Sequence, residues 1–292
     1  MRCCKRAVAV TLAIAVLPFV SAAPAVAARY VGLGDSAASG PVIPNQIPAP
    51  LGCWRSDHNF AHVVAQSLDV SLKDVSCSGA RTDHVWSPQD VFLGPNPPQL
   101  DALSKDTRRV TLQFGGNDIG FGEIVDACTT ASPYGHPCID RYAPNWPAGP
   151  DVLAERIAAT APKVAAVIQA IHSRAPRARV LVVGYAAIVP HAETDTGYPG
   201  CWPQVAIAWE DVPYLRATHE ALNTMLREQA ADPDNGATYV DSYAASVGRD
   251  ACQSSSVRWV EPSVPINPAA PLHPNARGMR GVAAAVLAAF RG

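Results

Sequence analysis

The sequence is poor in charged residues and especially poor in lysine. Only 16% of its 292 residues are charged, and four of its 23 basic residues are lysines. With 25 acidic residues the formal net charge is -2, so the chain has no basic excess with which to hold a phosphate backbone. Nucleic acid is therefore excluded as an expected partner. A hydrophobic fraction of 48% is enough for a folded core and excludes a disordered chain.

The sequence also lacks an apolar run long enough to cross a bilayer. Its longest run, Ala7 to Val20, has 14 residues and is shorter than the roughly 20 residues of a spanning helix, which disfavours a membrane anchor. The run follows a basic segment and precedes the small residues Ala25-Val26-Ala27, as in a secretory signal peptide with its cleavage site. We therefore expect a signal peptide at residues 1–27 and one secreted, extracellular domain at residues 28–292, monomeric and without stable membrane insertion.

No two cysteines have the Cys-x-x-Cys spacing typical of a zinc site. Six of the eight cysteines follow residue 27, and an even number in an exported chain favours disulfide bonds. Six cysteines allow many pairings, and the sequence alone does not choose among them. We expect pairing in chain order, because the segment between Cys128 and Cys138 is short and rich in turn residues. The expected bonds are Cys53–Cys77, Cys128–Cys138 and Cys201–Cys252.

Short β-rich apolar runs alternate with helical patterns after residue 27, which is typical of a parallel sheet covered by helices. The fold class we predict is three-layer α/β/α with a five-stranded, mainly parallel, flavodoxin-like sheet. Ligands of such sheets bind at the carboxyl ends of the strands. The predicted strands are 30–33, 72–76, 109–114, 179–184 and 238–240. The predicted helices run from Ser56 or Asp57 to about Leu68, from Asp151 to about Ser173, over 212–231 and over 276–290.

Three successive predicted strands end in short polar motifs. The first ends in Gly-Asp-Ser at residues 34–36, the second is followed by Cys-Ser-Gly at 77–79, and the third by Gly-Gly-Asn-Asp at 115–118. A serine on such a turn can act as a nucleophile, while a glycine N–H and an asparagine amide can stabilise an oxyanion. Alone, Gly-Asp-Ser is better explained as an ordinary turn. The other two motifs also have a turn as their ordinary explanation, since glycine and asparagine tolerate positive φ.

A histidine stands directly before the last predicted helix, in Pro271-Leu272-His273-Pro274-Asn275. From such a loop an imidazole can reach a serine at the sheet edge and act as its general base. The order of these four motifs, over about residues 29–291, resembles the SGNH hydrolase superfamily, also called GDSL lipases and esterases. The segment Cys53-Trp54-Arg55-Ser56 and the six-cysteine layout resemble its secreted actinobacterial branch.

The resemblance implies a serine hydrolase of carboxylic esters that uses neither a cofactor nor a metal. Ser36 matches the nucleophile and His273 matches the general base. The Ser36 N–H, the Gly79 N–H and the side chain of Asn117 match the donors of the oxyanion hole. The reaction would pass through an acyl-enzyme that water hydrolyses, with acylglycerols, phospholipid acyl chains or short-chain esters as substrates.

One position departs from the superfamily. Most members have an aspartate three residues before the histidine, where this chain has Ala270. We expect the main-chain carbonyl of Ala270, or of a close neighbour, to accept the Nδ1 proton of His273, with Asp241 or Glu261 as an alternative carboxylate. The departure also motivates an alternative, a catalytically inactive secreted binding protein on this scaffold. A carbohydrate acetyl esterase is the other alternative.

Several further residues have a functional and an ordinary explanation. His58 and His62 have the spacing of a metal-chelating helix pair, but the motif of zinc proteases is absent and a solvated helix face explains them better. Two carboxylates in the motifs are expected to support the turns. The residues that would line an acyl pocket, or else pack as ordinary loop residues, are Trp54, Ile119, Phe121 and Trp202; the supporting carboxylates are Asp35 and Asp118.

Overall fold

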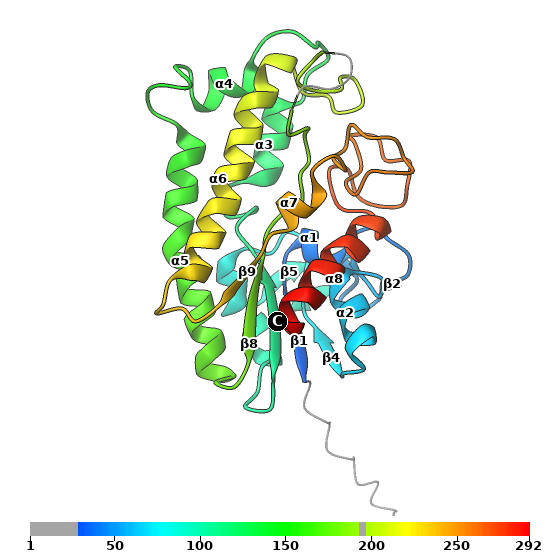
Figure 1. Cartoon of the computed structure of the whole chain (residues 1–292), viewed down its shortest axis with the longest axis vertical. Helices are drawn as coiled ribbons and strands as arrows, with labels where there is room; N and C mark the ends of the chain where they lie inside the picture. The colour runs from blue at the N-terminus through cyan, green and yellow to red at the C-terminus, as the bar shows by residue number, and fades with distance from the viewer. Residues whose placement is uncertain (1–28, 193–196) are drawn as a thin grey trace, which may run out of the picture.

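The structure is a computed structural model that describes residues 29–192 and 197–292 (Figure 1). Residues 1–27, the expected signal peptide, lie outside the described residues. Within the described ranges, no helix combines the length and the apolar character needed to cross a membrane.

Five strands form a wholly parallel central sheet in the order β4-β1-β7-β8-β9. Strand β4, the second of these five along the chain, lies on one side of β1, and β7, β8 and β9 follow on the other side. This is the flavodoxin-like order. The predicted fold class is confirmed, and each predicted strand matches a strand of this sheet. The strands are β1 (Tyr30–Gly34), β4 (Leu72–Asp74), β7 (Arg109–Gln113), β8 (Arg179–Val183) and β9 (Thr238–Val240).

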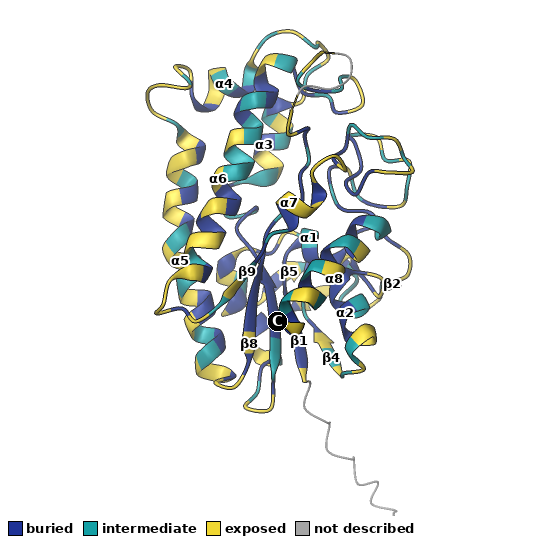
Figure 2. Cartoon of the chain, in the orientation of Figure 1, coloured by how far each residue is buried: buried dark blue, intermediate teal, exposed yellow. Residues whose placement is uncertain are grey.

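Helices cover both faces of the sheet (Figures 1 and 2). Side chains alternate between the two faces of a strand, so Val31 and Leu33 of β1 enter one hydrophobic core and Tyr30 enters the other. Every residue of β1 is buried, as expected for a parallel strand covered on both sides. The first core includes α5 (Val152–Arg174) and α6 (Val212–Ala231), and the second includes α2 (Phe60–Leu68) and α8 (Ala276–Arg291).

The four predicted helices are present, and one of them begins later than predicted. The side chain of Asp151 accepts hydrogen bonds from Leu153 N and Ala154 N and caps α5, as the sequence predicts. Helix α2 is capped by Asn59, so the prediction of Ser56 or Asp57 is wrong. The Ser56 hydroxyl instead accepts a hydrogen bond from His58 N, which closes a turn before the helix.

The remaining elements are short and lie in the connections. One of them is the β5–β6 hairpin. Its cross-strand pairs run from Gln89 with Asn96 to Val91 with Gly94. The other short elements are α1 (Ser36–Ser39), β2 (Gln46–Ile47), η1 (Leu51–Cys53), β3 (Arg55–Ser56), η2 (Thr82–Val85), β5 (Gln89–Val91), β6 (Gly94–Asn96), η3 (Gln99–Ala102), α3 (Phe121–Cys128), α4 (Pro137–Tyr142), η4 (Trp209–Asp211) and α7 (Ser242–Ser246).

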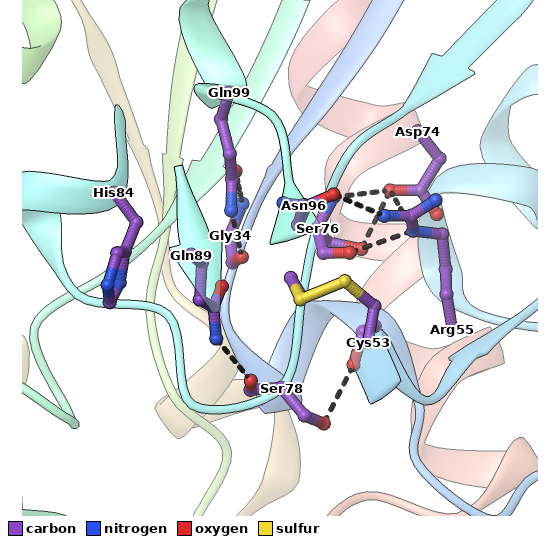
Figure 3. The surroundings of a disulfide bond; sticks show 12 residues. Gly34, Cys53, Arg55, Asp74, Ser76, Ser78, His84, Gln89, Asn96 and Gln99 are labelled. Atoms are coloured by element: carbon purple, nitrogen blue, oxygen red, sulfur yellow. Dashed lines mark hydrogen bonds and ion pairs between the residues drawn. A yellow bond between two sulfur atoms is a disulfide. The ribbon is translucent and has the colours of Figure 1, made fainter. Parts of the chain in front are cut away.

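Three disulfide bonds cross-link segments that lie outside the central sheet. They pair the six cysteines in chain order, as expected from the sequence. Cys53–Cys77 ties the end of η1 to the loop after β4 (Figure 3), close to one of the polar strand ends. The other two bonds are Cys128–Cys138 and Cys201–Cys252.

Candidate active site

Ser36 lies two residues after the end of β1, at the first position of the short helix α1. Asp35 caps this helix, since its side chain accepts a hydrogen bond from Ala37 N at 2.9 Å. Gly34 must be glycine here, because a Cβ would lie 2.7 Å from the Ala38 Cβ and 3.0 Å from the Gln113 carbonyl oxygen. The sharp turn from strand to helix therefore presents Ser36 at the carboxyl edge of the sheet.

The structure brings His273 to Ser36 across 237 residues of chain. The Oγ of Ser36 and the Nε2 of His273 are 2.8 Å apart. The other ring nitrogen, Nδ1, is 2.7 Å from the carbonyl oxygen of Pro271. A carbonyl only accepts, so Nδ1 must carry the proton, and Nε2 is left to accept the hydrogen bond from the serine hydroxyl. This tautomer is the one that a general base requires.

The carbonyl that holds His273 belongs to Pro271 and not to Ala270. The Ala270 carbonyl instead accepts the backbone N–H of His273 at 3.2 Å, so it closes a turn over residues 270–273. Leu272 has a φ of 59° in this turn, a left-handed conformation that few side chains of its size adopt. A proline followed by a residue with positive φ is typical of a type II turn, and its central peptide turns the Pro271 carbonyl toward the imidazole.

The two carboxylates considered for His273 are engaged elsewhere. Glu261 is buried and accepts hydrogen bonds from the side chains of Asn267 and Asn275. Its main chain pairs with the histidine loop, since Glu261 N donates to the His273 carbonyl at 3.0 Å. Asp241 caps α7 and forms an ion pair with Arg227. Glu261 thus supports the loop that carries His273 without contacting the imidazole.

The surroundings of His273 favour its neutral form. Burial lowers the pKa of His273, and the hydrogen bond to the Pro271 carbonyl opposes this effect in part. The ring of Phe121 packs edge-on against the imidazole with centroids 5.7 Å apart. An imidazole with a lowered pKa is unprotonated at neutral pH and is ready to accept a proton.

Gly79 and Asn117 belong to neighbouring loops that the structure joins. The Nδ2 of Asn117 donates to the Ala80 carbonyl at 2.9 Å, which leaves its second amide hydrogen for another acceptor. The Ser78 hydroxyl is 3.3 Å from the Ser39 hydroxyl of α1. Gly79 therefore sits between a contact to the helix of Ser36 and a contact to Asn117. Among the described residues, the Gly79 N–H has no hydrogen-bond partner.

A partly buried tyrosine, which sequence reasoning missed, joins the first and third strand ends. The hydroxyl of Tyr185 donates to Asp35 Oδ2 at 2.6 Å and accepts the N–H of Gly116 at 2.9 Å. Burial raises the pKa of Asp35 to about 7, while the hydrogen bonds from Tyr185 and Ala37 act in the opposite direction. Tyr185 follows β8 almost directly, so its place at a fourth strand end was the available signal.

The other carboxylate of these motifs supports a loop. Asp118 accepts hydrogen bonds from Thr82 N, at 3.1 Å to Oδ2, and from the Thr82 hydroxyl. These bonds tie the loop after β7 to η2, which follows Gly79. Asp118 thus has the supporting role expected from the sequence.

A largely apolar pocket opens beside Ser36 and His273. It encloses about 1040 Å³ of empty space, including its open mouth. Ile119 and Phe121 line it, as considered from the sequence, whereas Trp54 and Trp202 do not. Most of the other apolar side chains come from α3, from the loops between β8 and α6, and from α6 itself. They include Ile124, Val125, Ile188, Val189, Ile207, Leu215 and Leu222.

The two histidines with helical spacing do not face a common ligand. His58 contacts Asp57, whereas His62 contacts Asn59 and lies 3.5 Å from Asp74 Oδ2. In the part of the chain that the structure describes, no three acidic, cysteine or histidine side chains are grouped to hold a metal ion.

A serine after the first strand and a histidine before the last helix, meeting at the carboxyl edge of a flavodoxin-like sheet, define a hydrolase of the SGNH class. The chain belongs to the GDSL-like Lipase/Acylhydrolase family, whose model matches residues 33–280. It is therefore a lipase or esterase, a hydrolase of carboxylic esters, and the prediction from its motifs is confirmed.

Known proteins resemble this chain in sequence and in structure. The chain is 39% identical over 259 residues to Lipase 2 of Streptomyces coelicolor, covering 87% of this chain and 83% of that protein. The crystal structure of phospholipase A1 from Streptomyces albidoflavus superposes with a TM-score of 0.70 at 24% identity, covering 91% of this chain and 99% of that one. The extracellular lipase of Streptomyces rimosus gives a TM-score of 0.67 at 25% identity, with 90% and 97% covered.

Proposed function

We propose that this protein is a secreted esterase that cleaves lipid acyl esters through an acyl intermediate on Ser36. The observation that carries the proposal is the hydrogen-bonded chain from Ser36 Oγ through His273 to the Pro271 carbonyl, at 2.8 and 2.7 Å. A nucleophile within hydrogen-bond reach of a base, itself held by a third group, is the arrangement of a serine hydrolase.

In the proposed reaction, His273 Nε2 takes the hydroxyl proton as Ser36 Oγ attacks the ester carbonyl carbon. The carbonyl oxygen becomes an oxyanion, which the N–H groups of Ser36 and Gly79 and the amide of Asn117 stabilise. The tetrahedral intermediate collapses, the bond to the alcohol breaks, and His273 gives its proton to the leaving alcohol. Water, deprotonated by His273, then attacks the acyl-enzyme and releases the carboxylic acid.

The main-chain groups proposed for the oxyanion hole are free to donate. Within the described residues neither the Ser36 N–H nor the Gly79 N–H has a hydrogen-bond partner. The Ser36 N–H also lies at the start of α1, where backbone N–H groups point away from the helix. These unpaired donors support a site built for a developing negative charge.

The proposed substrate class rests on the apolar pocket. Burial of a lipid acyl chain among Ile119, Phe121 and Leu215 is favourable because it removes apolar surface from water. An acetyl group would leave most of this apolar surface uncovered. We therefore favour lipid acyl esters over the acetyl esters of a carbohydrate. The intact contact between Ser36 and His273 likewise supports an enzyme over an inactive binding protein.

A series of p-nitrophenyl esters from acetate to palmitate tests this proposal, with the Ser36→Ala variant as the control for background hydrolysis. We expect kcat/KM to increase from acetate toward longer chains and the variant to lose the activity. A maximum at acetate would favour a glycan deacetylase. Hydrolysis of no ester by the folded, oxidised wild type would favour a binding protein.

Secretion belongs to the same proposal, with residues 1–27 removed and residues 28–292 forming the mature domain. Three disulfide bonds support it, because such bonds persist mainly in oxidising compartments. Sequencing the N-terminus of protein recovered from the culture medium tests this point. We expect the secreted protein to start at Ala28. Protein that stays in the cell with residues 1–27 still attached would contradict secretion.

A further inference from the structure

The β5–β6 hairpin packs against the loop that carries Gly79. Gln89, the first residue of β5, is buried, and its Nε2 donates a hydrogen bond to the Ser78 carbonyl at 2.8 Å (Figure 3). A Cβ on Gly79 would lie 3.6 Å from the same nitrogen. The carboxamide of Gln89 therefore contacts the loop at the peptide that joins Ser78 to Gly79.

The carbonyl of Ser78 and the N–H of Gly79 belong to one planar peptide group. In a trans peptide these two groups point in opposite directions, so a donor that fixes the carbonyl also fixes the direction of the N–H. Gly79 has a φ of 78°, and glycine rotates more freely than other residues. A restraint on the carbonyl side is thus an effective way to hold the N–H of this peptide in one direction.

The other end of the Gln89 side chain has no such partner. In the described part of the chain, Gln89 Oε1 is buried without a hydrogen bond. Buried polar atoms are nearly always paired, because leaving one unpaired is unfavourable. Packing of the hairpin alone would be served better by an apolar side chain. The amide at this position is explained by the hydrogen bond that it makes to Ser78.

We propose that Gln89 is a positioning residue for ester hydrolysis, which aims the Gly79 N–H at the oxyanion by holding the Ser78 carbonyl. This inference rests on the proposed function, in which Gly79 donates to the oxyanion. The hydrogen bond to the carbonyl also polarises the peptide and makes its N–H a stronger donor. Gln89 acts only through this peptide, so it contributes to the transition state more than to substrate binding.

The test compares Gln89→Glu and Gln89→Met with the matched control Asn96→Asp. Asn96 is the cross-strand partner of Gln89, is also buried and accepts a hydrogen bond from Arg55, but the hydrogen bond to the Ser78 carbonyl comes from Gln89. Rates are measured per active site, counted by titration with a phosphonate, so that unfolded protein does not enter kcat.

Both Gln89 variants are expected to lower kcat about tenfold with little change in KM, less than the loss of a whole oxyanion donor. The glutamate variant provides a second readout. An ionised carboxylate cannot donate to the Ser78 carbonyl, whereas a protonated one can. The ratio of its kcat to that of the wild type should therefore rise as the pH is lowered, and the ratio for Gln89→Met should not. Asn96→Asp should stay within about twofold of the wild type.

Two results would overturn the inference while leaving the proposed function intact. One is a wild-type kcat in both Gln89 variants, and the other is an equal fall in Asn96→Asp. A wild-type kcat would refute a role in the transition state even if KM rose. If the wild type shows no hydrolysis that depends on Ser36, the proposed function itself fails and the inference fails with it.

Discussion

Replacing Asp35 with asparagine is expected to remove a large pH dependence from the stability of the fold. Burial raises the pKa of Asp35 from the usual 3.8 to about 7 in the folded protein. Below pH 3.8 the carboxyl group is protonated in both the folded and the unfolded chain, so its ionisation does not lower the free energy of unfolding. As the pH rises, the unfolded chain loses its proton first, and stability falls until the folded carboxyl group also ionises near pH 7. The whole change is about 4 kcal/mol, since one pKa unit is worth about 1.4 kcal/mol.

Asparagine retains the helix cap but replaces the oxygen that accepts from the Tyr185 hydroxyl with an NH2 group, a loss that does not depend on pH. Its side-chain oxygen can still accept the hydrogen bond from Ala37 N, and asparagine is as good a helix cap as aspartate. The assay is chemical denaturation of the wild type and Asp35→Asn from pH 4 to pH 8, with the disulfides intact. Subtracting the two curves cancels the other titrating groups. The wild type should lose about 4 kcal/mol relative to the variant over this range. A constant difference between the two curves would refute the assignment of a raised pKa to Asp35.

Three further predictions concern catalysis and the cross-links. Burial lowers the pKa of His273 from 6.5, and only the neutral ring accepts a proton. We therefore expect kcat/KM to fall as the pH drops, with an inflection below pH 6.5. An inflection above pH 6.5 would contradict His273 as the general base. Asn117→Ala should lose about a hundredfold or more in kcat on p-nitrophenyl esters, and a near-normal rate would remove Asn117 from the oxyanion hole. Loss of the bond between Cys201 and Cys252, which are 51 residues apart, should lower the free energy of unfolding by about 4 kcal/mol in the chain-entropy model. Loss of the bond between Cys128 and Cys138, 10 residues apart, should cost about 3 kcal/mol in denaturation of the paired serine variants, and the opposite ranking would contradict that model.

The fold was predictable because its signals are local. A strand that is buried on both faces reads as a short apolar run, and each such run is followed by turn residues that mark the carboxyl end of the strand. The motifs at Ser36, Gly79 and Asn117 occupy three of these ends, so the order of the strands alone gathers them at one edge. His273 precedes the last helix and reaches the same edge.

The parts that escaped prediction depend on contacts between distant segments. A main-chain carbonyl at or near Ala270 was expected to hold His273, and the structure assigns this role to Pro271. The assignment depends on the left-handed conformation of Leu272, which is not predictable from a leucine in the sequence. The β5–β6 hairpin turns at Phe92 and Leu93 without the asparagine or glycine that typically marks such a loop. The roles of Tyr185 and Gln89 are set by hydrogen bonds to Asp35 and Ser78.

Labelling with a fluorophosphonate is the sharpest test of whether Ser36 is a nucleophile activated by His273. The probe reacts only with an activated serine, and mass spectrometry of the labelled protein identifies the modified residue. We expect rapid labelling of Ser36 in the wild type, none in Ser36→Ala and much slower labelling in His273→Ala. Labelling of another serine would exclude Ser36 as the nucleophile, and equal labelling rates in the wild type and His273→Ala would exclude His273 as its base.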